Sequence, residues 1–308
     1  MTATGRSVRT ALIVVNFASS GLIAQNLGGM TLPDGVSVVV VDCYSSADER
    51  ARVAALCDAQ GWRAVLLDEN AGFGGGVNAG ASRAIADGAE VIATLNPDAT
   101  IDEGSLTALI AAAVADPSAL VSPRIVTGDG RSWFAGSDLY LDDGSTAGRR
   151  RRTANEGRPR IEWATGACFA MSASLWERTG GFDDEYFLYW EDVDLSRRVQ
   201  ETGGRLALLE SAVAVHDEGQ THGRSASDRA KSETYYYFNI RNRLIYAAKH
   251  LDDAGVSRWL RTARAVSYGI LLQGGRRQLL VSRAPWRAYR RGLRDGRAFI
   301  REERGITR

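Results

Sequence analysis

Carboxylates and aromatic side chains alternate in the segment GGFDDEYFLYWEDVDLSRR, residues 180–198. Six carboxylates lie within twelve of its residues, interleaved with Tyr186, Phe187, Tyr189 and Trp190. Glu191 and Asp192 stand where a helix should begin, and the helix dipole favours negative charge there. One interpretation is simple helix capping. The other is a carboxylate base beside an aromatic wall that packs on a sugar-like or flat substrate, since an ionised Asp can accept a proton.

A glycine-rich segment, ENAGFGGGVNAG at residues 69–80, follows a predicted strand and opens a predicted helix. Glycines let a backbone approach a ligand closely, and a helix N-terminus favours an anion such as a diphosphate. The segment also fits a loose dinucleotide fingerprint, Gly74-x-Gly76-x-x-Ala79, although it follows the third strand rather than the first. A third interpretation is a glycine-rich turn required only for packing. A P-loop is excluded because no Gly-Lys-Ser/Thr follows.

The residues Asn96-Pro97-Asp98 end an apolar run, and His216 ends another. Asn, Pro and Asp are all common turn formers, so chain reversal alone could explain residues 96–98. If the run is a strand of a parallel sheet, Asp98 lies at the edge where α/β proteins hold ligands. No paired metal spacing such as HExxH is present. A metal would therefore have few protein ligands, which suits Mg²⁺ or Mn²⁺ shared with a diphosphate.

The elements that must position these residues alternate along the first 115 residues. Continuous β-branched runs are predicted as strands at 11–16, 36–42, 64–68 and 91–95. Segments of helical composition lie at 21–30, 48–60, 76–88 and 103–115. This alternation predicts a doubly wound, mostly parallel sheet covered on both faces.

The second half of the chain is less regular. Residues 127–160 are rich in Gly, Asp and Arg and predict hairpins and a mobile loop. Ordered elements follow: strands at 163–171 and 205–216, and helices at 172–179, 191–202 and 232–250.

Composition excludes several classes of protein. The 308 residues contain 44% hydrophobic residues and a formal net charge of +1, which argues against nucleic-acid binding and disorder. The three cysteines are widely spaced, which argues against a disulfide framework or zinc cluster and fits a reducing cytoplasm. We expect neither a signal peptide nor a transmembrane helix.

In order and spacing, these motifs resemble the GT-A-fold family 2 glycosyltransferases, in particular the rhamnosyltransferase-like and galactofuranosyltransferase-like branch. The resemblance covers about residues 11–246. It is carried by VVNF at 14–17, VVDCYSSAD at 40–48, NAGFGGGVNAG at 70–80, LNPDA at 95–99, GACFAMSASLWERTGGFDDEYFLYWEDVDLSRR at 166–198, His216, and YYYFNIRNRLIY at 235–246.

The resemblance implies a role for each matched position. Asp192 would be the general base with Glu191 beside it, and Asp98 the ligand of a divalent metal, with His216 as a further ligand or diphosphate contact. Asp42 would accept from the nucleotide base. The remaining sugar-nucleotide contacts would be Asn16, Asn70, Gly72, Phe73, Gly76, Asn78 and Asn96. The acceptor would lie near Trp163, Gly166, Asp183 and Trp190.

Two positions depart from the family pattern. Cys43 stands where an Asn usually follows the base-binding Asp, at the expected ribose contacts. Asn96 replaces the first acid of the DxD-type motif, so the metal site has one carboxylate fewer.

The resemblance implies a metal-dependent, inverting transfer of a sugar of the L-rhamnose or galactofuranose type. The donor would be a dTDP- or UDP-linked sugar and the acceptor a glycan or polyprenyl-linked glycan in cell-surface polysaccharide assembly. The alternatives are a non-catalytic sugar-nucleotide or glycan-binding module that kept the fold, and a nucleotide-dependent oxidoreductase using the glycine-rich segment.

The last 58 residues are strongly basic, with 14 Arg, no Lys and 5 acidic residues. Arginines spaced with Trp, Tyr and Leu predict an amphipathic helical tail at 251–308, after a GT-A domain at 1–250 with nucleotide-binding (1–125) and acceptor (126–250) halves. The tail fits an interfacial membrane binder. Packing on the body or on the second subunit of a homodimer is the alternative. Membrane contact would make the enzyme cytoplasmic and peripheral on the inner face of the plasma membrane.

Overall fold

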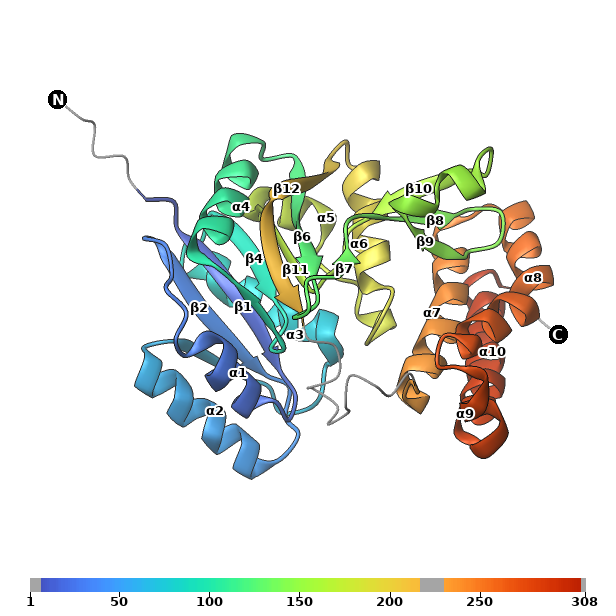
Figure 1. Ribbon diagram of the computed structural model, residues 1–308, viewed down its shortest axis with the longest axis horizontal. Helices are drawn as coiled ribbons and strands as arrows, with labels where there is room; N and C mark the ends of the chain where they lie inside the picture. The colour runs from blue at the N-terminus through green and yellow to red at the C-terminus, as the bar shows by residue number, and fades with distance from the viewer. Residues whose placement is uncertain (1–6, 217–229, 306–308) are drawn as a thin grey trace.

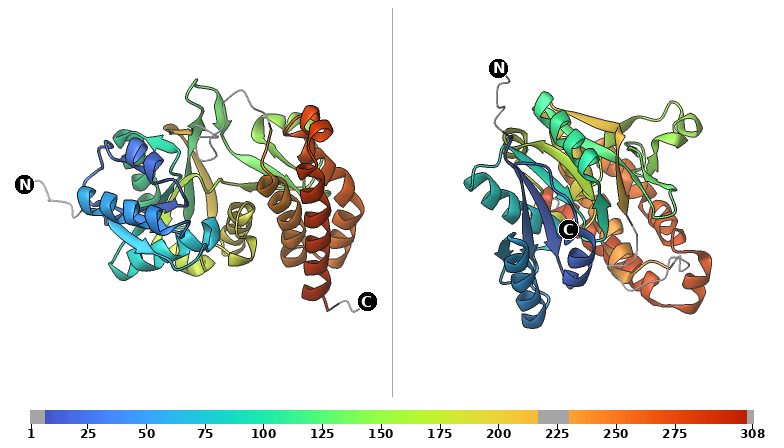
Figure 2. Two further views of the ribbon diagram at one scale, coloured as in Figure 1. Left: turned by 90° about the horizontal axis from the view of Figure 1, so that it is seen from below. Right: turned by 60° about the vertical axis from the view of Figure 1, so that its left-hand side comes forward.

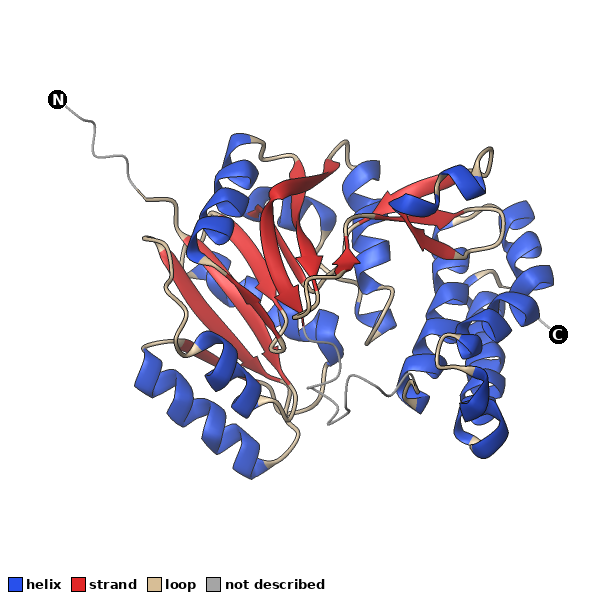
Figure 3. Cartoon of the chain, in the orientation of Figure 1, coloured by secondary structure: helices blue, strands red, loops and turns tan. Residues whose placement is uncertain are grey.

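The computed structural model describes residues 7–216 and 230–305, and a large mixed sheet forms the centre of its first part (Figures 1 and 3). Within the described residues the strand order is β3-β2-β1-β4-β11-β6-β12-β5, with β7 added beside β6. The strands are β1 (Thr10–Asn16), β2 (Val36–Asp42), β3 (Arg63–Leu66), β4 (Val91–Leu95), β5 (Ala99–Ile101), β6 (Ala119–Val126), β7 (Ser132–Phe134), β11 (Cys168–Ser172) and β12 (Arg205–His216).

Alternate residues of each strand face opposite layers of helices, as strand geometry requires. In β1, Leu12 and Val14 pack under α1, α2 and α4, whereas Ile13 and Val15 pack under α3, α5 and α6. These helices are α1 (Ser20–Leu27), α2 (Ala47–Gln60), α3 (Gly72–Ala86), α4 (Glu103–Ala115), α5 (Ala173–Thr179) and α6 (Glu191–Glu201). The predicted two-sided α/β architecture is thereby confirmed.

The sheet is parallel over β3-β2-β1-β4 and mixed beyond. β11 runs antiparallel to both β4 and β6, while β12 is parallel to β6. β6, which lies between β11 and β12 in the sheet, was not predicted from the sequence. The antiparallel β11 has a functional consequence, because it brings the chain just before Cys168 alongside the end of β4, where Asn96 donates its backbone N–H to the Ala167 carbonyl.

A second, smaller sheet and a set of helices form the other end of the molecule (Figure 2). The residues predicted as hairpins supply β8 (Ser137–Tyr140) and β9 (Thr146–Gly148), and β8 pairs antiparallel with both β9 and β10 (Arg160–Trp163). Four consecutive arginines occupy 149–152, a pattern typical of solvated surface, but Arg152 makes a two-pronged ion pair with the fully buried Asp138, at 2.7 and 2.6 Å.

The C-terminal helices pack into a unit of their own. α7 (Glu233–His250) packs along α10 (Ala284–Glu303) and α8 (Asp253–Leu272). In the chain, the short α9 (Arg276–Val281) connects α8 to α10. Ile240 and Leu244 of α7 share one hydrophobic cluster with Leu271 and Leu293. The boundary expected at residue 250 therefore cuts through a packed unit, because the apolar face of the tail needs α7 to cover it.

One side chain of α7 fastens the loop that leads into α6. Asn242 is fully buried, and its amide nitrogen lies 2.7, 2.9 and 2.7 Å from the carbonyl oxygens of Tyr186, Leu188 and Tyr189. Tyr189 and Trp190 have φ angles of 64° and 77°, a conformation that non-glycine residues adopt only when their surroundings enforce it.

Among the helices of the described residues, none combines the length and the apolar content that crossing a bilayer requires.

Replacing Asn242 with Ala should lower the free energy of unfolding by about 1–3 kcal/mol, because buried carbonyl groups lose their donor. Urea unfolding followed by circular dichroism measures this. The matched control is Asn239→Ala one turn earlier, since among the described residues Asn239 donates to the Tyr235 carbonyl of its own helix and to no other group. Equal losses in the two variants would contradict an anchoring role for Asn242.

Candidate active site

The two predicted catalytic carboxylates begin α6. Glu191 is buried and Asp192 is half-buried. The carboxylate of Asp192 accepts the Gly166 N–H on one oxygen at 3.1 Å and the Val193 N–H on the other at 2.8 Å. These contacts hold Asp192 in one orientation on the segment that precedes β11.

The surroundings of the pair separate its acid–base properties. Burial raises the pKa of Asp192 to about 6, against the opposing effect of its two backbone donors. Burial, together with the neighbouring Asp192 charge, raises the pKa of Glu191 well above its ordinary value. Asp192 is therefore the first of the two to ionise. A carboxylate next to a neutral acid is an arrangement that supports general base chemistry.

A second group of predicted site residues gathers at the end of β4. His216 of β12 lies with its Nε2 3.1 Å from the Asp98 carboxylate and 3.4 Å from the Asn96 amide nitrogen. Asp98 and His216 are both buried. The antiparallel pairing of His216 with Ala99 explains how residues 118 apart in sequence come together.

These residues fit a divalent metal that shares its coordination with substrate. Asp98 offers carboxylate oxygens and His216 an imidazole, and the His216 Nδ1 is buried with no hydrogen-bond partner within the described residues. The described residues contain no group of three or more His, Cys, Asp or Glu side chains placed to hold a metal ion. Phosphate oxygens and water would have to supply the remaining ligands.

Gly166 connects the two groups. Its N–H binds Asp192, and its carbonyl accepts the Thr94 hydroxyl of β4 at 3.0 Å. A side chain at this position would meet the Phe73 ring, at 3.0 Å from an added Cβ. Asp192 and Phe73 therefore both lie next to Gly166, beside the strand that carries the Asn96 and Asp98 turn.

The structure corrects the expected role of Asp42. Its side chain is fully buried, and its oxygens accept from Asn16 at 2.9 Å and from Arg50 at 3.3 Å. Asn16 also caps the turn into α1 by accepting the Ser19 N–H. Because both oxygens are occupied and covered, Asp42 and Asn16 organise the ends of β1 and β2 rather than meeting a base directly.

The glycine-rich segment is likewise filled by protein. A Cβ added at Gly76 would lie within 3 Å of side-chain atoms of Val15 and Cys43. Gly72 has a φ of 74° and packs on the Phe187 carbonyl, which also accepts the Phe73 N–H.

Polar side chains of the same segment are also used within the protein. Asn70 accepts the Gly72 N–H at 2.9 Å. Asn78 clamps Phe182 through donated and accepted bonds of 2.8 and 2.9 Å. The N–H groups of Gly72 and Phe73 at the start of α3 are therefore already used within the protein. The packing interpretation holds for Gly72, Gly76 and Asn78, and the dinucleotide fingerprint loses its support.

Cys43, the departure from the family pattern, has a definite place. Burial raises the pKa of its thiol to about 11, so the group stays protonated. Its Sγ lies 3.6 Å from the Gly72 carbonyl and can donate to it. Cys43 thus joins the end of β2 to the start of α3.

Sequence reasoning missed three aromatic side chains near these strand ends. Phe17 and Tyr44 directly follow the β1 and β2 regions and are 49% and 40% exposed, with the Arg50 guanidinium 4.6 Å from the Tyr44 ring. Trp133 of β7 lies 4.4 Å from the His216 ring. For Phe17 and Tyr44 the available signal was an aromatic residue one or two positions beyond an apolar run, whereas Trp133 follows a polar segment and gave no such signal.

The residues expected to contact the acceptor do not form one surface in the structure. Trp190 is buried against Tyr246 and Trp259, so it cannot present a face to a sugar. This burial corrects its assignment, and the cause is the covering of the loop by α7 and α8. Trp163 is half-buried beside Phe134, and its indole nitrogen is buried without a partner in the described part of the chain.

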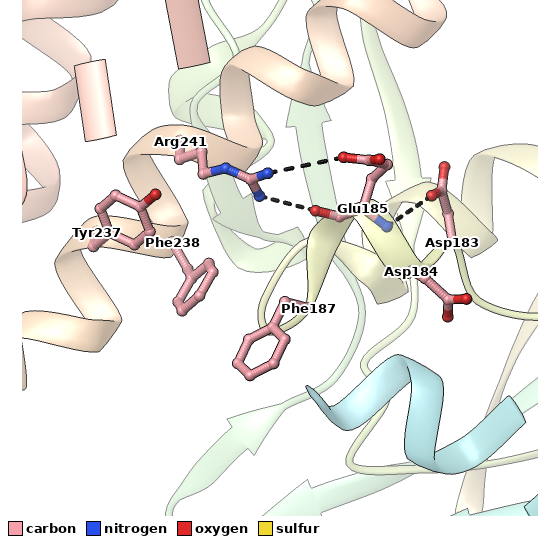
Figure 4. A pocket seen from close by; sticks show the side chains of 7 residues that line it. All are labelled: Asp183, Asp184, Glu185, Phe187, Tyr237, Phe238 and Arg241. Carbon is pink, nitrogen blue, oxygen red and sulfur yellow. Dashed lines mark hydrogen bonds and ion pairs between the residues drawn. The ribbon is translucent and has the colours of Figure 1, made fainter. Parts of the chain in front are cut away.

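Asp183 lines a shallow hollow of about 630 Å³ between the loop and α7 (Figure 4). The Phe187 and Phe238 rings stack there at 5.3 Å, and Arg241 donates to the Glu185 carbonyl at 2.8 Å. Asp183 itself is paired with Lys249 at 2.5 Å. The exposed aromatic faces in this hollow are those of the loop and α7, not Trp190.

Comparison with known proteins agrees with the geometry. The model of glycosyl transferase family 2 matches residues 21–180, which is more than half of the chain. An N-acetylglucosaminyl-diphospho-decaprenol L-rhamnosyltransferase of Mycobacterium tuberculosis is 30% identical over 163 residues, 46% of this chain and 52% of that protein. The low-salt glycan biosynthesis hexosyltransferase Agl10 of Haloferax volcanii is 24% identical over 76% of this chain and 74% of its own.

The chain thus spans about half the length of the mycobacterial relative. The solved structure of the mannosyltransferase PcManGT from Pyrobaculum calidifontis, in complex with GDP-Man and Mn²⁺, shares the fold with a TM-score of 0.55. It is 16% identical and covers 98% of this chain and 87% of that one. With the family model matched and the GT-A fold confirmed, the chain belongs to glycosyl transferase family 2.

Proposed function

We propose that the chain transfers a sugar of the L-rhamnose or galactofuranose type from a dTDP- or UDP-linked donor to a polyprenyl-linked glycan acceptor. Membership of the family supports the reaction class. The mycobacterial relative is named for adding L-rhamnose to a decaprenol-linked sugar, which supports this choice of donor and acceptor. The observation that carries the proposal is the Asp192 carboxylate, oriented by Gly166 beside the strand end that holds Asp98.

The mechanism follows from the protonation states. Asp192 takes the proton of an acceptor hydroxyl as that oxygen attacks the anomeric carbon of the donor. The bond from this carbon to the diphosphate breaks, and its electron pair leaves with the nucleoside diphosphate. One displacement with one base inverts the configuration at the anomeric carbon. Burial and the Asp192 charge raise the pKa of Glu191, which disfavours a second negative charge beside Asp192.

Residues at the end of β4 would serve the leaving group. Asp98 and His216 would hold Mg²⁺ or Mn²⁺, which when bound stabilises negative charge on the diphosphate. Asn96 beside His216 adds an amide rather than a second carboxylate, so the site carries less negative charge toward the substrate phosphates. Phe17 and Tyr44 offer exposed aromatic faces to a nucleobase at the neighbouring strand ends.

Asp192→Asn should lower kcat by roughly a hundredfold or more, because a positioned base contributes at least that factor. Binding of the nucleoside diphosphate, measured by calorimetry, should be unchanged. Glu201→Gln at the exposed end of the same helix is the matched control and should turn over normally. Near-normal turnover in Asp192→Asn would refute the assignment of the base.

The pH dependence of kcat/KM should report the same group. Asp192 acts as a carboxylate, and its pKa is raised to about 6, so protonation on the acid side removes the base. We expect kcat/KM to fall by roughly tenfold per pH unit below about pH 6 and to level off above it. A flat profile from about pH 5 to 7 would contradict a base with this pKa.

Asp98→Asn keeps the shape of the side chain but removes its charge. In the wild type we expect Mn²⁺ to tighten binding of UDP or dTDP, and EDTA to reverse this effect. In the variant the Mn²⁺-dependent gain should drop by roughly tenfold or more, since even losing a second-shell partner costs this much. Asp129→Asn, an exposed turn residue, is the control. An unaltered metal response in Asp98→Asn would leave the Asn-Pro-Asp segment as a turn only.

A further inference from the structure

The C-terminal helices carry an unusual run of positive charge. Between Asp253 and Asp295 the sequence has ten arginines and no acidic residue or lysine. The packing described above covers one face of α8 and α10 with α7, including Trp259 and Leu293. Most apolar anchors of the tail are therefore interior, and only what remains outside can meet a partner.

What remains outside is concentrated around α9. Leu280 and Val281 at its end are 87% and 75% exposed, the highest values among the large apolar residues that stand out as exposed in the described chain. Tyr268 of α8 and Trp286 of α10 flank them at 43% and 37% exposure. The two rings stack at 6.2 Å, and the Trp286 indole donates to the Leu279 carbonyl at 3.0 Å. We call these four residues the α9 patch.

Arginines precede and follow the apolar end of α9 in the chain. Arg276 and Arg277 begin α9, Arg283 follows it, and all three are exposed. No carboxylate of the described residues lies within ion-pair distance of them. Elsewhere in the same unit arginines are paired, as Arg287 is with Glu233 and Arg304 with Asp253. The patch thus combines projecting apolar side chains with uncompensated positive charge.

We propose that the α9 patch docks on an anionic lipid bilayer. Leu280 and Val281 would enter the interface between headgroups and acyl chains, with the aromatic pair at headgroup level. Arg276, Arg277 and Arg283 would meet lipid phosphates. Exposed apolar groups flanked by arginine fit this surface because burial of apolar area and attraction to anionic headgroups act together.

The location suits the proposed acceptor, and this step rests on the proposed function. α9 is tied to the start of α7, since Gln278 accepts from the Tyr236 hydroxyl at 2.7 Å and donates to the Lys231 carbonyl at 2.8 Å. Tyr237 and Phe238, the next residues of α7, line the hollow beside the catalytic loop. A bilayer held at α9 therefore lies at the end of the helix that lines this hollow, so a polyprenyl-linked glycan could reach it from the membrane.

Sedimentation of the full chain with vesicles tests the proposal without donor or acceptor. We expect the wild type to bind phosphatidylcholine vesicles containing about one-third phosphatidylglycerol, and to bind pure phosphatidylcholine far less. Added salt should weaken binding, because it screens headgroup attraction. The double variant Leu280→Glu, Val281→Glu should lose roughly tenfold or more in vesicle affinity. Val114→Glu, an equally simple change at an exposed site on α4, should bind like the wild type.

Arg276→Glu with Arg277→Glu separates charge from apolar insertion, and should abolish the preference for anionic vesicles. Equal binding of wild type and both double variants would overturn the proposal. So would light scattering that shows a wild-type dimer converted to a monomer by Leu280→Glu, Val281→Glu without vesicle binding, since the patch would then cover a second copy. Nucleoside diphosphate binding by the same variants is the separate readout of the proposed function. If the wild type does not bind a nucleoside diphosphate, the proposed function is refuted, whereas the vesicle result still holds.

Discussion

The contact on which the active end of the molecule depends is the amide of Asn242 beneath the loop that precedes α6. Three carbonyl oxygens converge on one nitrogen, and the residues carrying them lie next to left-handed Tyr189 and Trp190. A backbone bent this sharply needs an external tie. The bend turns the chain so that Asp192 emerges against Gly166. The C-terminal helices thus serve catalysis indirectly, since α7 supplies the tie and is itself held by α8 and α10.

Much of the scaffold could be predicted from the sequence because its signals are local. Helix α4 spans Glu103–Ala115 and strand β12 Arg205–His216, both as expected. Continuous apolar runs indicate the strands, and the residues at helix ends indicate where helices begin and stop, so each bound can be read from a few neighbouring residues. β6 was missed, because its Ser122-Pro123 interior breaks the apolar run that identifies a strand.

Side-chain roles were less predictable where they depend on partners distant in sequence. The grouping of Asp98 with His216 was implied by the family resemblance, and it is observed. Two side-chain orientations could not be inferred, because each depends on contacts between elements far apart in the chain. Asp42 accepts hydrogen bonds from Asn16 and Arg50, and Trp190 packs inward against Trp259. The family resemblance located these positions, but not the direction in which their side chains point.

The close approach of α3 to the sheet has a mechanical consequence. At Gly76 and Gly80 even a methyl group would meet Val15, Cys43, Ile13 or Val41 within 3 Å, so the spacing of helix and strands is already minimal. A layer packed this tightly cannot tighten further around a ligand. The proposed donor side is therefore preorganised, so binding of a nucleotide there would cost little conformational entropy. Any closing movement must come from the opposite wall, where the loop before α6 lies between α3 and α7 and is held to both by hydrogen bonds.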